Sequence, residues 1–270
     1  MKVIYDLGSN NGDDLEYYLL KADRVVAVEA NPDLCKIIET RFSREIADSR
    51  LFVENCAITD KEADNVDFYI HQRYHFLGSL IPPEQNSFDW RKISIGALPL
   101  HHLISKHGQP YYIKIDLEGC DELALHALLN CNTKPQYISA ESHTIGVFAL
   151  LAEKLGYRSF KLVDGHSVDK AYSKKLIYSP VAKCLVEHSF PRHSAGPFGD
   201  DIDGDWLDKT SLLRVLAMRG LGWIDIHATN EAAPTSMGEF EYWTASSKRA
   251  VSTLIQSTLR KIKQANKLDS

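Results

Sequence analysis

Short apolar runs alternate with amphipathic stretches along most of the chain, and this alternation predicts its elements. Apolar runs of this length are typical of strands that are buried in a sheet, and four of them end in an acidic residue. We predict strands at 3–6, 24–29, 51–55, 66–70, 111–116, 136–141 and 157–163, with a late strand at 222–226. The amphipathic stretches predict helices at 13–20, 31–42, 100–106, 121–129, 145–155 and 207–219. Strands and helices that alternate in this way form a mostly parallel sheet with helices on both faces, which is an α/β fold.

Three stretches depart from this alternation. Residues 71–98 hold several aromatic residues and two adjacent prolines, and we interpret them as an insertion or a substrate-side loop. Residues 189–205 are rich in glycine and aspartate, and we interpret them as a lid or an acceptor-binding loop that holds no metal. The tail at 246–266 predicts an amphipathic helix whose lysine and arginine residues form a solvated face.

Composition narrows the class of protein. Hydrophobic residues make up 44% of the 270 residues and charged residues 25%, which suits one domain with a core at 1–163 and a C-terminal elaboration at 164–270. The net charge of −5 provides no basic field for a nucleic acid. Five cysteines without metal-ligand spacing indicate neither disulfides nor zinc and favour a reducing compartment. Because no apolar run reaches the roughly 18 residues of a membrane span and the chain enters a strand without a signal peptide, we expect a cytoplasmic protein.

The turn after the first predicted strand is the first candidate site. Asp6, Gly8 and Gly12 stand at the carboxyl end of that strand, where open α/β sheets bind ligands. The two glycines let the backbone bend and approach a ligand closely, but the third glycine of a pyrophosphate-binding turn is missing. S-adenosylmethionine carries no phosphate and suits this turn better than a dinucleotide. Asp6 can face its cationic groups, the N–H groups of the turn can bind its carboxylate, and Glu29 can accept hydrogen bonds from its ribose.

Three segments follow one another at characteristic separations. They are Val-Ile-Tyr-Asp-Leu-Gly-Ser-Asn-Asn-Gly at 3–12, Val-Ala-Val-Glu-Ala-Asn-Pro at 26–32 and Ile-Lys-Ile-Asp-Leu-Glu-Gly at 113–119. Together they resemble the FkbM family of S-adenosylmethionine-dependent methyltransferases over about residues 3–157. The resemblance implies a class I methyltransferase fold with a seven-stranded sheet. It also implies O-methylation of a hydroxyl on a small-molecule, sugar or glycan acceptor.

The resemblance also implies roles for individual residues. At the matching positions the cofactor-binding residues would be Asp6, Gly8, Ser9, Asn10 and Gly12 at the methionine end, Glu29 and Asn31 at the ribose, Asn55 and Ala57 at the adenine, and Asp116 near the methyl group. Glu118 would face the substrate with Asp116. Because the chain begins at its first strand, the segments that often cover the cofactor in this fold are expected to be absent. We expect residues 71–98 and 189–205 to close the site instead.

Methyl transfer to an alcohol requires alignment of the reactants and removal of a proton. Asp116, Glu118, Glu141 and His143 follow two strands that are predicted to be neighbours, so they are the catalytic candidates. His143 is the natural base, since the pKa of an ordinary histidine lies near neutrality. In a less favoured alternative, Asp116 and Glu141 hold Mg²⁺ or Mn²⁺, with or without His143, and the metal acidifies the hydroxyl. Alternatively, Glu118 could only stabilise the positive end of the helix that follows it, and His143 could be an ordinary loop residue.

Two other classes of function stay open at this point. One is a non-catalytic binding module on the same fold, and the other is an NAD-dependent oxidoreductase. The acidic residues at four strand ends argue against the first class, and the missing phosphate-binding glycine argues against the second.

Overall fold

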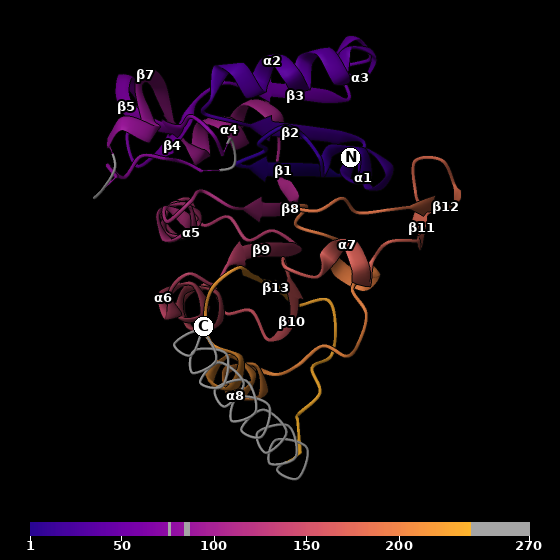
Figure 1. The fold of residues 1–270 in the computed structure, drawn as a ribbon. Coiled ribbons are helices and arrows are strands. Elements are labelled where there is room, and N and C mark those ends of the chain that lie inside the picture. Colours follow the sequence, from indigo (N-terminus) through magenta and orange to yellow (C-terminus); the bar gives the residue numbers. More distant parts are fainter. Residues whose placement is uncertain (75–76, 84–86, 239–270) are drawn as a thin grey trace, which may run out of the picture.

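A seven-stranded sheet forms the centre of the computed structural model, which describes residues 1–74, 77–83 and 87–238 (Figure 1). The strands lie in the order β10-β13-β9-β8-β1-β2-β3. Neighbouring strands are parallel except in the two pairs that β13 makes, which are antiparallel. The strands are β1 (Val3–Leu7), β2 (Arg24–Val28), β3 (Leu51–Glu54), β8 (Pro110–Ile115), β9 (Tyr137–Glu141), β10 (Ser159–Asp164) and β13 (Ile224–Thr229). The mostly parallel sheet expected from the sequence is confirmed.

The sheet reverses its strand order between β1 and β8. From β1 the chain continues to β2 and β3 on one side, and from β8 it continues to β9 on the other. In open α/β sheets a ligand crevice forms at such a reversal, outside the carboxyl ends of the strands. Asp6 is near this end of β1 and Asp116 follows β8 directly. The topology therefore places both carboxylates at the ligand-binding edge of the sheet.

Helices cover both faces of the sheet (Figure 1). They are α1 (Leu15–Lys21), α2 (Pro32–Arg41), α3 (Ser43–Ala47), α4 (Leu100–His107), α5 (Asp121–Asn130), α6 (Ile145–Ala149), which continues as the π-helical turn η2 (Leu150–Lys154), and α8 (Lys209–Arg219). Successive side chains of a strand point to opposite faces, so each strand contributes to two cores. Tyr5 and Leu7 of β1 pack in one core with α4, α5, α6 and α8, and Ile4 packs in the other with α1 and α2.

The chain beyond β10 returns to the large sheet. It first forms α7 (Val168–Ala171), an antiparallel hairpin of β11 (Lys175–Ser179) and β12 (Cys184–His188), and the short helix η3 (Gly199–Asp201). We call residues 190–206, between this hairpin and α8, the strap. Phe198 and Trp206 of the strap are buried in the core that contains α1. The strap therefore covers one face of the sheet before α8 and β13 complete it.

Residues 71–98, which we interpreted as an insertion or a substrate-side loop, contain regular strands, and Leu77, Gly78 and Leu80 line the cavity described below. A second sheet, of order β4-β7-β5-β6, contains β4 (Ala57–Thr59), β5 (Ala63–His71), β6 (Gly78–Ser79) and β7 (Trp90–Pro99), and the short helix η1 (Ser87–Asp89) precedes β7. Ile93, Ile95 and Ala97 alternate with polar residues along β7, which is the pattern of a half-buried strand. This strand was not predicted from the sequence, and in the structure it pairs with β5.

Two further observations concern the C-terminal half. The hairpin of β11 and β12 was not predicted, and the helix expected at 246–266 lies outside the described residues. Within 1–74, 77–83 and 87–238, no helix is long and apolar enough to cross a membrane.

Candidate cofactor-binding and active site

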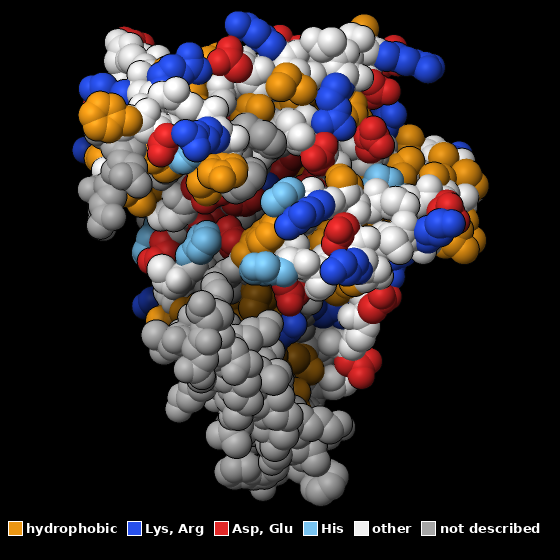
Figure 2. Space-filling view, in the orientation of Figure 1, with side chains coloured by type: hydrophobic (Ala, Val, Ile, Leu, Met, Phe, Trp, Pro, Cys, Tyr) orange, Lys and Arg blue, Asp and Glu red, His pale blue; other side chains and the backbone are white. Residues whose placement is uncertain are grey.

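A cavity of about 450 Å³ lies at the carboxyl ends of β1, β2, β8 and β9. Figure 2 shows this face, with acidic side chains inside a hollow and histidines at its rim. The volume suits a small-molecule ligand. Of the residues expected to bind the cofactor or to act in catalysis, those that line the cavity are Gly8, Ser9, Asn10, Glu29, Asn31, Ala57, Asp116, Glu118 and Glu141.

The turn after β1 passes so close to β8 that only glycine fits at position 8. Gly8 has a φ of +82°, and a Cβ at this position would lie 1.9 Å from the carbonyl oxygen of Asp116. The N–H groups of Gly8 and Ser9 both donate to the carbonyl of Val28, at 2.9 and 3.1 Å. The backbone of the turn is therefore fixed between β2 and β8, and its next residues form the floor of the cavity.

Gly12 and Asn55 contribute outside the cavity lining. A Cβ on Gly12 would lie 2.9 Å from Leu15 and 3.1 Å from Ile38, so this glycine allows α1 and α2 to pack closely. The side-chain amide of Asn55 donates to the carbonyls of Glu29 and Ala30, at 2.9 and 3.1 Å. Both residues hold the backbone around the cavity.

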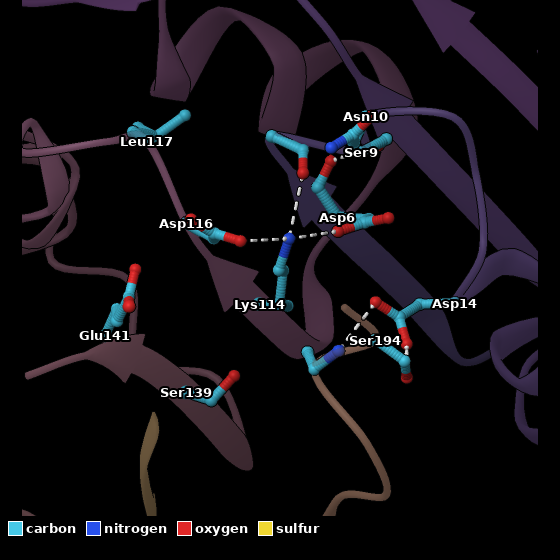
Figure 3. A network of polar contacts seen from close by, with 12 residues as sticks. Asp6, Ser9, Asn10, Asp14, Lys114, Asp116, Leu117, Ser139, Glu141 and Ser194 are labelled. Atoms are coloured by element: carbon cyan, nitrogen blue, oxygen red, sulfur yellow. Dashed lines mark hydrogen bonds and ion pairs between the residues drawn. The ribbon is translucent and has the colours of Figure 1, made fainter. Parts of the chain in front are cut away.

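Lys114 joins the two carboxylates at the ends of β1 and β8 (Figure 3). Its Nζ lies 3.4 Å from Asp6 Oδ1 and 3.2 Å from Asp116 Oδ2, and it donates to the carbonyl of Gly8 at 2.8 Å. Burial lowers the pKa of Lys114, but Asp116 and Asp6 outweigh this effect and raise it well above its usual value. The charged lysine thus holds Asp6 beneath the turn, where Asp6 does not line the cavity, and fixes Asp116 at its edge.

Lys114 was not singled out from the sequence, although a signal was present. It stands between Ile113 and Ile115 in a strand predicted to be buried. A lysine is almost never fully buried without a charged partner. A lysine in such a run therefore predicts a nearby carboxylate, and the register of β1 against β8 supplies Asp6 directly beside it.

Glu29 connects the turn after β1 to the turn after β2. Its carboxylate accepts the N–H of Asn10 at 2.8 Å and the N–H of Asn31 at 2.7 Å. The side chain of Asn31 in turn accepts the N–H of Asp33 and caps α2. Burial raises the pKa of Glu29 to about 7. Glu29 therefore lines the cavity in a fixed orientation, with backbone donors on both of its oxygens.

Asp116 and Glu141, at the ends of β8 and β9, lie close enough to Glu118 to raise its pKa. Burial, and then the charges of Asp116 and Glu141, raise the pKa of Glu118 to about 8. His143 Nε2 lies 2.8 Å from Glu141 Oε2, and this hydrogen bond is the main reason that the pKa of His143 rises to about 9. At neutral pH Glu118 is therefore mostly protonated and His143 is mostly charged. His143 does not line the cavity.

Asp14, which was not singled out from the sequence, ties the strap to the lining of the cavity. It precedes α1, lines the cavity and accepts hydrogen bonds from Ser194 Oγ and from the N–H of Ala195, the latter at 3.0 Å (Figure 3). Farther along the strap, Phe198 stacks on Tyr112 of β8, with ring centroids 4.0 Å apart. These contacts fix the strap against the sheet and bring His193 to the cavity.

Asp116 and Glu141, the acids considered for a divalent metal, each have a cationic partner. Lys114 pairs with Asp116 and His143 pairs with Glu141. Among the residues that the structure describes, no group of three or more His, Cys, Asp or Glu side chains is arranged to hold a metal ion.

The raised pKa of Glu118 predicts how stability depends on pH. A carboxyl whose pKa is raised in the folded state contributes stability at low pH, and this contribution is lost as the pH rises through the folded-state pKa. Between pH 7.0 and 8.5, Glu118 alone should lower the free energy of unfolding by about 1 kcal/mol. This decrease corresponds to a Tm lower by about 2–4 °C. Burial lowers the pKa of His227 to about 3, so this histidine changes the pH dependence of stability mainly below pH 7.

Thermal unfolding followed by circular dichroism at the two pH values measures this effect. Glu118→Gln should reduce the difference in Tm, whereas Glu187→Gln, at an exposed position of β12, should leave it unchanged. A Tm that is equal or higher at pH 8.5 would contradict the assignment of a buried, protonated Glu118.

Comparisons with known proteins concern the fold. No protein-family model and no curated protein matches the sequence. The chain is similar in structure to methyltransferase FkbM from Methylobacillus flagellatus KT, at 17% identity and a TM-score of 0.41, over 60% of this chain and 40% of that chain. The C-terminal domain of precorrin-6Y C5,15-methyltransferase from Rhodobacter capsulatus is similar at 12% identity and a TM-score of 0.35, over 70% of this chain and 74% of that chain. StiE O-MT is similar at 10% identity and a TM-score of 0.34, over 93% of this chain and 74% of that chain.

The sheet itself identifies the fold. When its strands are numbered along the chain, they lie in the order 3-2-1-4-5-7-6, and only the seventh strand is antiparallel to the others. This order, with helices on both faces and a ligand cavity at the carboxyl end of the first strand, is that of class I methyltransferases. The chain therefore has an α/β fold with the strand order of class I methyltransferases.

Proposed function

We propose that the protein is an S-adenosylmethionine-dependent methyltransferase that acts on a hydroxyl of a small molecule, sugar or glycan. The observation that carries this proposal is the excess of acidic over basic side chains in the lining of the cavity. Its acidic lining residues are Asp13, Asp14, Glu29, Asp116, Glu118 and Glu141. Its lysine, Lys114, is already paired with two carboxylates. Such a lining suits a ligand with ammonium and sulfonium groups, whereas the pyrophosphate of a dinucleotide would be repelled.

The residues that line the cavity can be matched one after another to the parts of S-adenosylmethionine. The turn from Gly8 to Asn11 offers backbone donors for the carboxylate, and Glu29 offers acceptors for the ribose hydroxyls. Ala57, Ile58 and Phe68 form an apolar end that suits adenine. When bound, the cofactor supplies an electrophilic methyl group on its sulfonium. The acidic end, at Asp116 and Glu141, is left for the methyl acceptor.

We assign proton removal from the acceptor hydroxyl to the carboxylates, with Asp116 as the principal base. His143 is mostly charged at neutral pH, because its hydrogen bond to Glu141 raises its pKa to about 9. Glu118 is mostly protonated at that pH, so it can donate a hydrogen bond to the acceptor but cannot remove a proton. Asp116 lines the cavity, and Lys114 holds it in one orientation. A general base in this position contributes roughly 10²–10⁴-fold to the rate.

Replacement of Asp116 by asparagine tests this assignment. The amide keeps the shape of the side chain but cannot accept the proton, so transfer should fall by roughly 10²-fold or more. The measurement is transfer of a trideuteromethyl group from labelled S-adenosylmethionine to a mixture of polar metabolites, followed by mass spectrometry. Binding of S-adenosylhomocysteine should change little, and Asp48→Asn, at an exposed position after α3, is the matched control. Unchanged transfer by Asp116→Asn would reject Asp116 as the base.

A further inference from the structure

The acidic end of the cavity faces an aromatic wall that consists of His193 and Trp223. Both residues line the same cavity as Asp116, Glu118 and Glu141. The two rings are stacked, with centroids 5.3 Å apart and an interplanar angle of 17°. His193 comes from the strap, and Trp223 comes from the turn that leads into β13. Segments far apart in the chain therefore meet at the end of the cavity that the cofactor does not need.

Trp223 is held rigidly beside the end of β9. The N–H of Gly222 donates to the carbonyl of Ser142 at 3.1 Å, and Ser142 Oγ donates to the carbonyl of Gly222 at 3.2 Å. Ser142 directly follows Glu141, so the position of the ring is coupled to that of an acidic lining residue. A Cβ on Gly165 would lie 2.3 Å from Trp223 Nε1, which shows how closely the indole packs on that backbone.

His193 is positioned by the contacts that anchor the strap. Its φ of 72° lies in the left-handed region, and the next two residues, Ser194 and Ala195, bind the buried carboxylate of Asp14. Asp14 lines the cofactor side of the cavity. The aromatic wall is therefore built on the same side chain that borders the proposed cofactor site, so it is a preformed surface and not a freely moving loop.

The chemistry of this end of the cavity selects among acceptors. Asp116, Glu118 and Glu141 can bind hydroxyl groups. Asp116 and Glu141 each have a cationic partner, but the lining of the cavity holds six acidic residues against one lysine, and this excess disfavours an anion. Leu80 and Leu117 add apolar surface to the same cavity. Aromatic rings favour contact with the flat face of another ring. An uncharged ring that carries hydroxyl groups matches all of these features, whereas the negative charge of a phosphate ester, a sulfate ester or a free carboxylate does not suit this lining.

We infer that His193 and Trp223 form the acceptor subsite and that the enzyme methylates an uncharged, hydroxylated ring while it excludes anionic acceptors. This inference rests on the proposed function, because it assigns the remainder of the cavity to the acceptor. His193 and Trp223 are the residues that determine specificity in this account. Neither is required for the cofactor to bind.

The charge of the acceptor is tested directly by fractionating the metabolite mixture. A neutral and cationic pool is separated from an anionic pool by anion exchange, and each is incubated with the protein and trideuteromethyl-labelled S-adenosylmethionine. Label should enter ring compounds of the unretained pool. Label confined to the retained, anionic pool would overturn the inference but leave the methyltransferase assignment intact. Absence of label from both pools would overturn the assignment and the inference together.

The aromatic wall is tested with Trp223→Leu and with His193→Asn, since asparagine tolerates the left-handed backbone at position 193. Each variant should raise the KM for the labelled acceptor about tenfold, with a smaller change in kcat and an unchanged Kd for S-adenosylhomocysteine. Phe88→Leu, at a 95% exposed aromatic residue outside the cavity, is the matched control and should behave as the wild type. A KM equal to that of the wild type in both wall variants, or an equal loss of cofactor affinity, would refute an acceptor subsite at these residues.

Discussion

Gly8→Ala is expected to abolish cofactor binding and to lower the free energy of unfolding by about 4 kcal/mol or more, the range of the most damaging single substitutions. Two effects combine at this position. An alanine with the φ of +82° observed for Gly8 is strained by about 1–2 kcal/mol. In addition, its Cβ would lie 1.9 Å from the carbonyl oxygen of Asp116, which is backbone and cannot rotate away. Either the turn or the β1–β8 pairing must therefore move, and both border the cavity.

Gly204→Ala separates the two effects. Gly204 has nearly the same φ, +83°, but a Cβ there would meet no atom within 4 Å. This control should show the backbone strain alone, about 1–2 kcal/mol, with cofactor affinity unchanged. The measurements are urea unfolding and calorimetric titration with S-adenosylhomocysteine. Equal losses of stability in the two variants would show that the close approach of the turn to Asp116 does not matter.

Lys114→Met is expected to lower the free energy of unfolding by about 3–5 kcal/mol, because it removes the cation from a buried ion pair. Asp6 is 1% exposed and would be left without the charge that now lies 3.4 Å from its carboxylate. Asp116 would lose the partner that fixes it at the cavity edge (Figure 3). Methyl transfer should fall together with stability, and urea unfolding and the labelled-transfer assay measure the two losses.

A double-mutant cycle with Asp6→Asn distinguishes the ion pair from a simple packing defect. Removal of both charges leaves no uncompensated buried ion at position 6, and only the partly exposed Asp116 still lacks its partner. The variant with both substitutions should therefore be more stable than the sum of the single losses predicts. Additive losses would mean that Lys114 supports the fold by its volume and not by its charge.

The sequence was sufficient to predict the parts of the fold that depend on local pattern. Strands of the large sheet are short apolar runs, and the acids that end them mark the carboxyl edge of the sheet. The order of these runs with their helices was enough to infer a mostly parallel sheet. The same pattern identified the turn at Gly8, the acid at Glu29 and the acids at Asp116 and Glu141, which all line one cavity.

Features that depend on distant pairing were not predictable in the same way. β7 alternates apolar and polar residues, but its place follows from pairing with β5. The contact between Asp14 and Ser194 joins residues 180 positions apart, and no periodic pattern reports it. Gly12 is a second feature whose role could not be predicted from the sequence. A glycine-rich turn suggests ligand contact, but only the packing of α1 on α2 shows that Gly12 serves the core.

Calorimetric titration of the wild-type protein with S-adenosylhomocysteine tests the central claim most directly. The claim is that the acidic cavity above β1, β2 and β8 binds this class of cofactor. We expect one molecule to bind per chain with a micromolar Kd, and NADH under the same conditions to give no binding. No binding of S-adenosylhomocysteine at millimolar concentration, or saturable binding of NADH instead, would contradict the account.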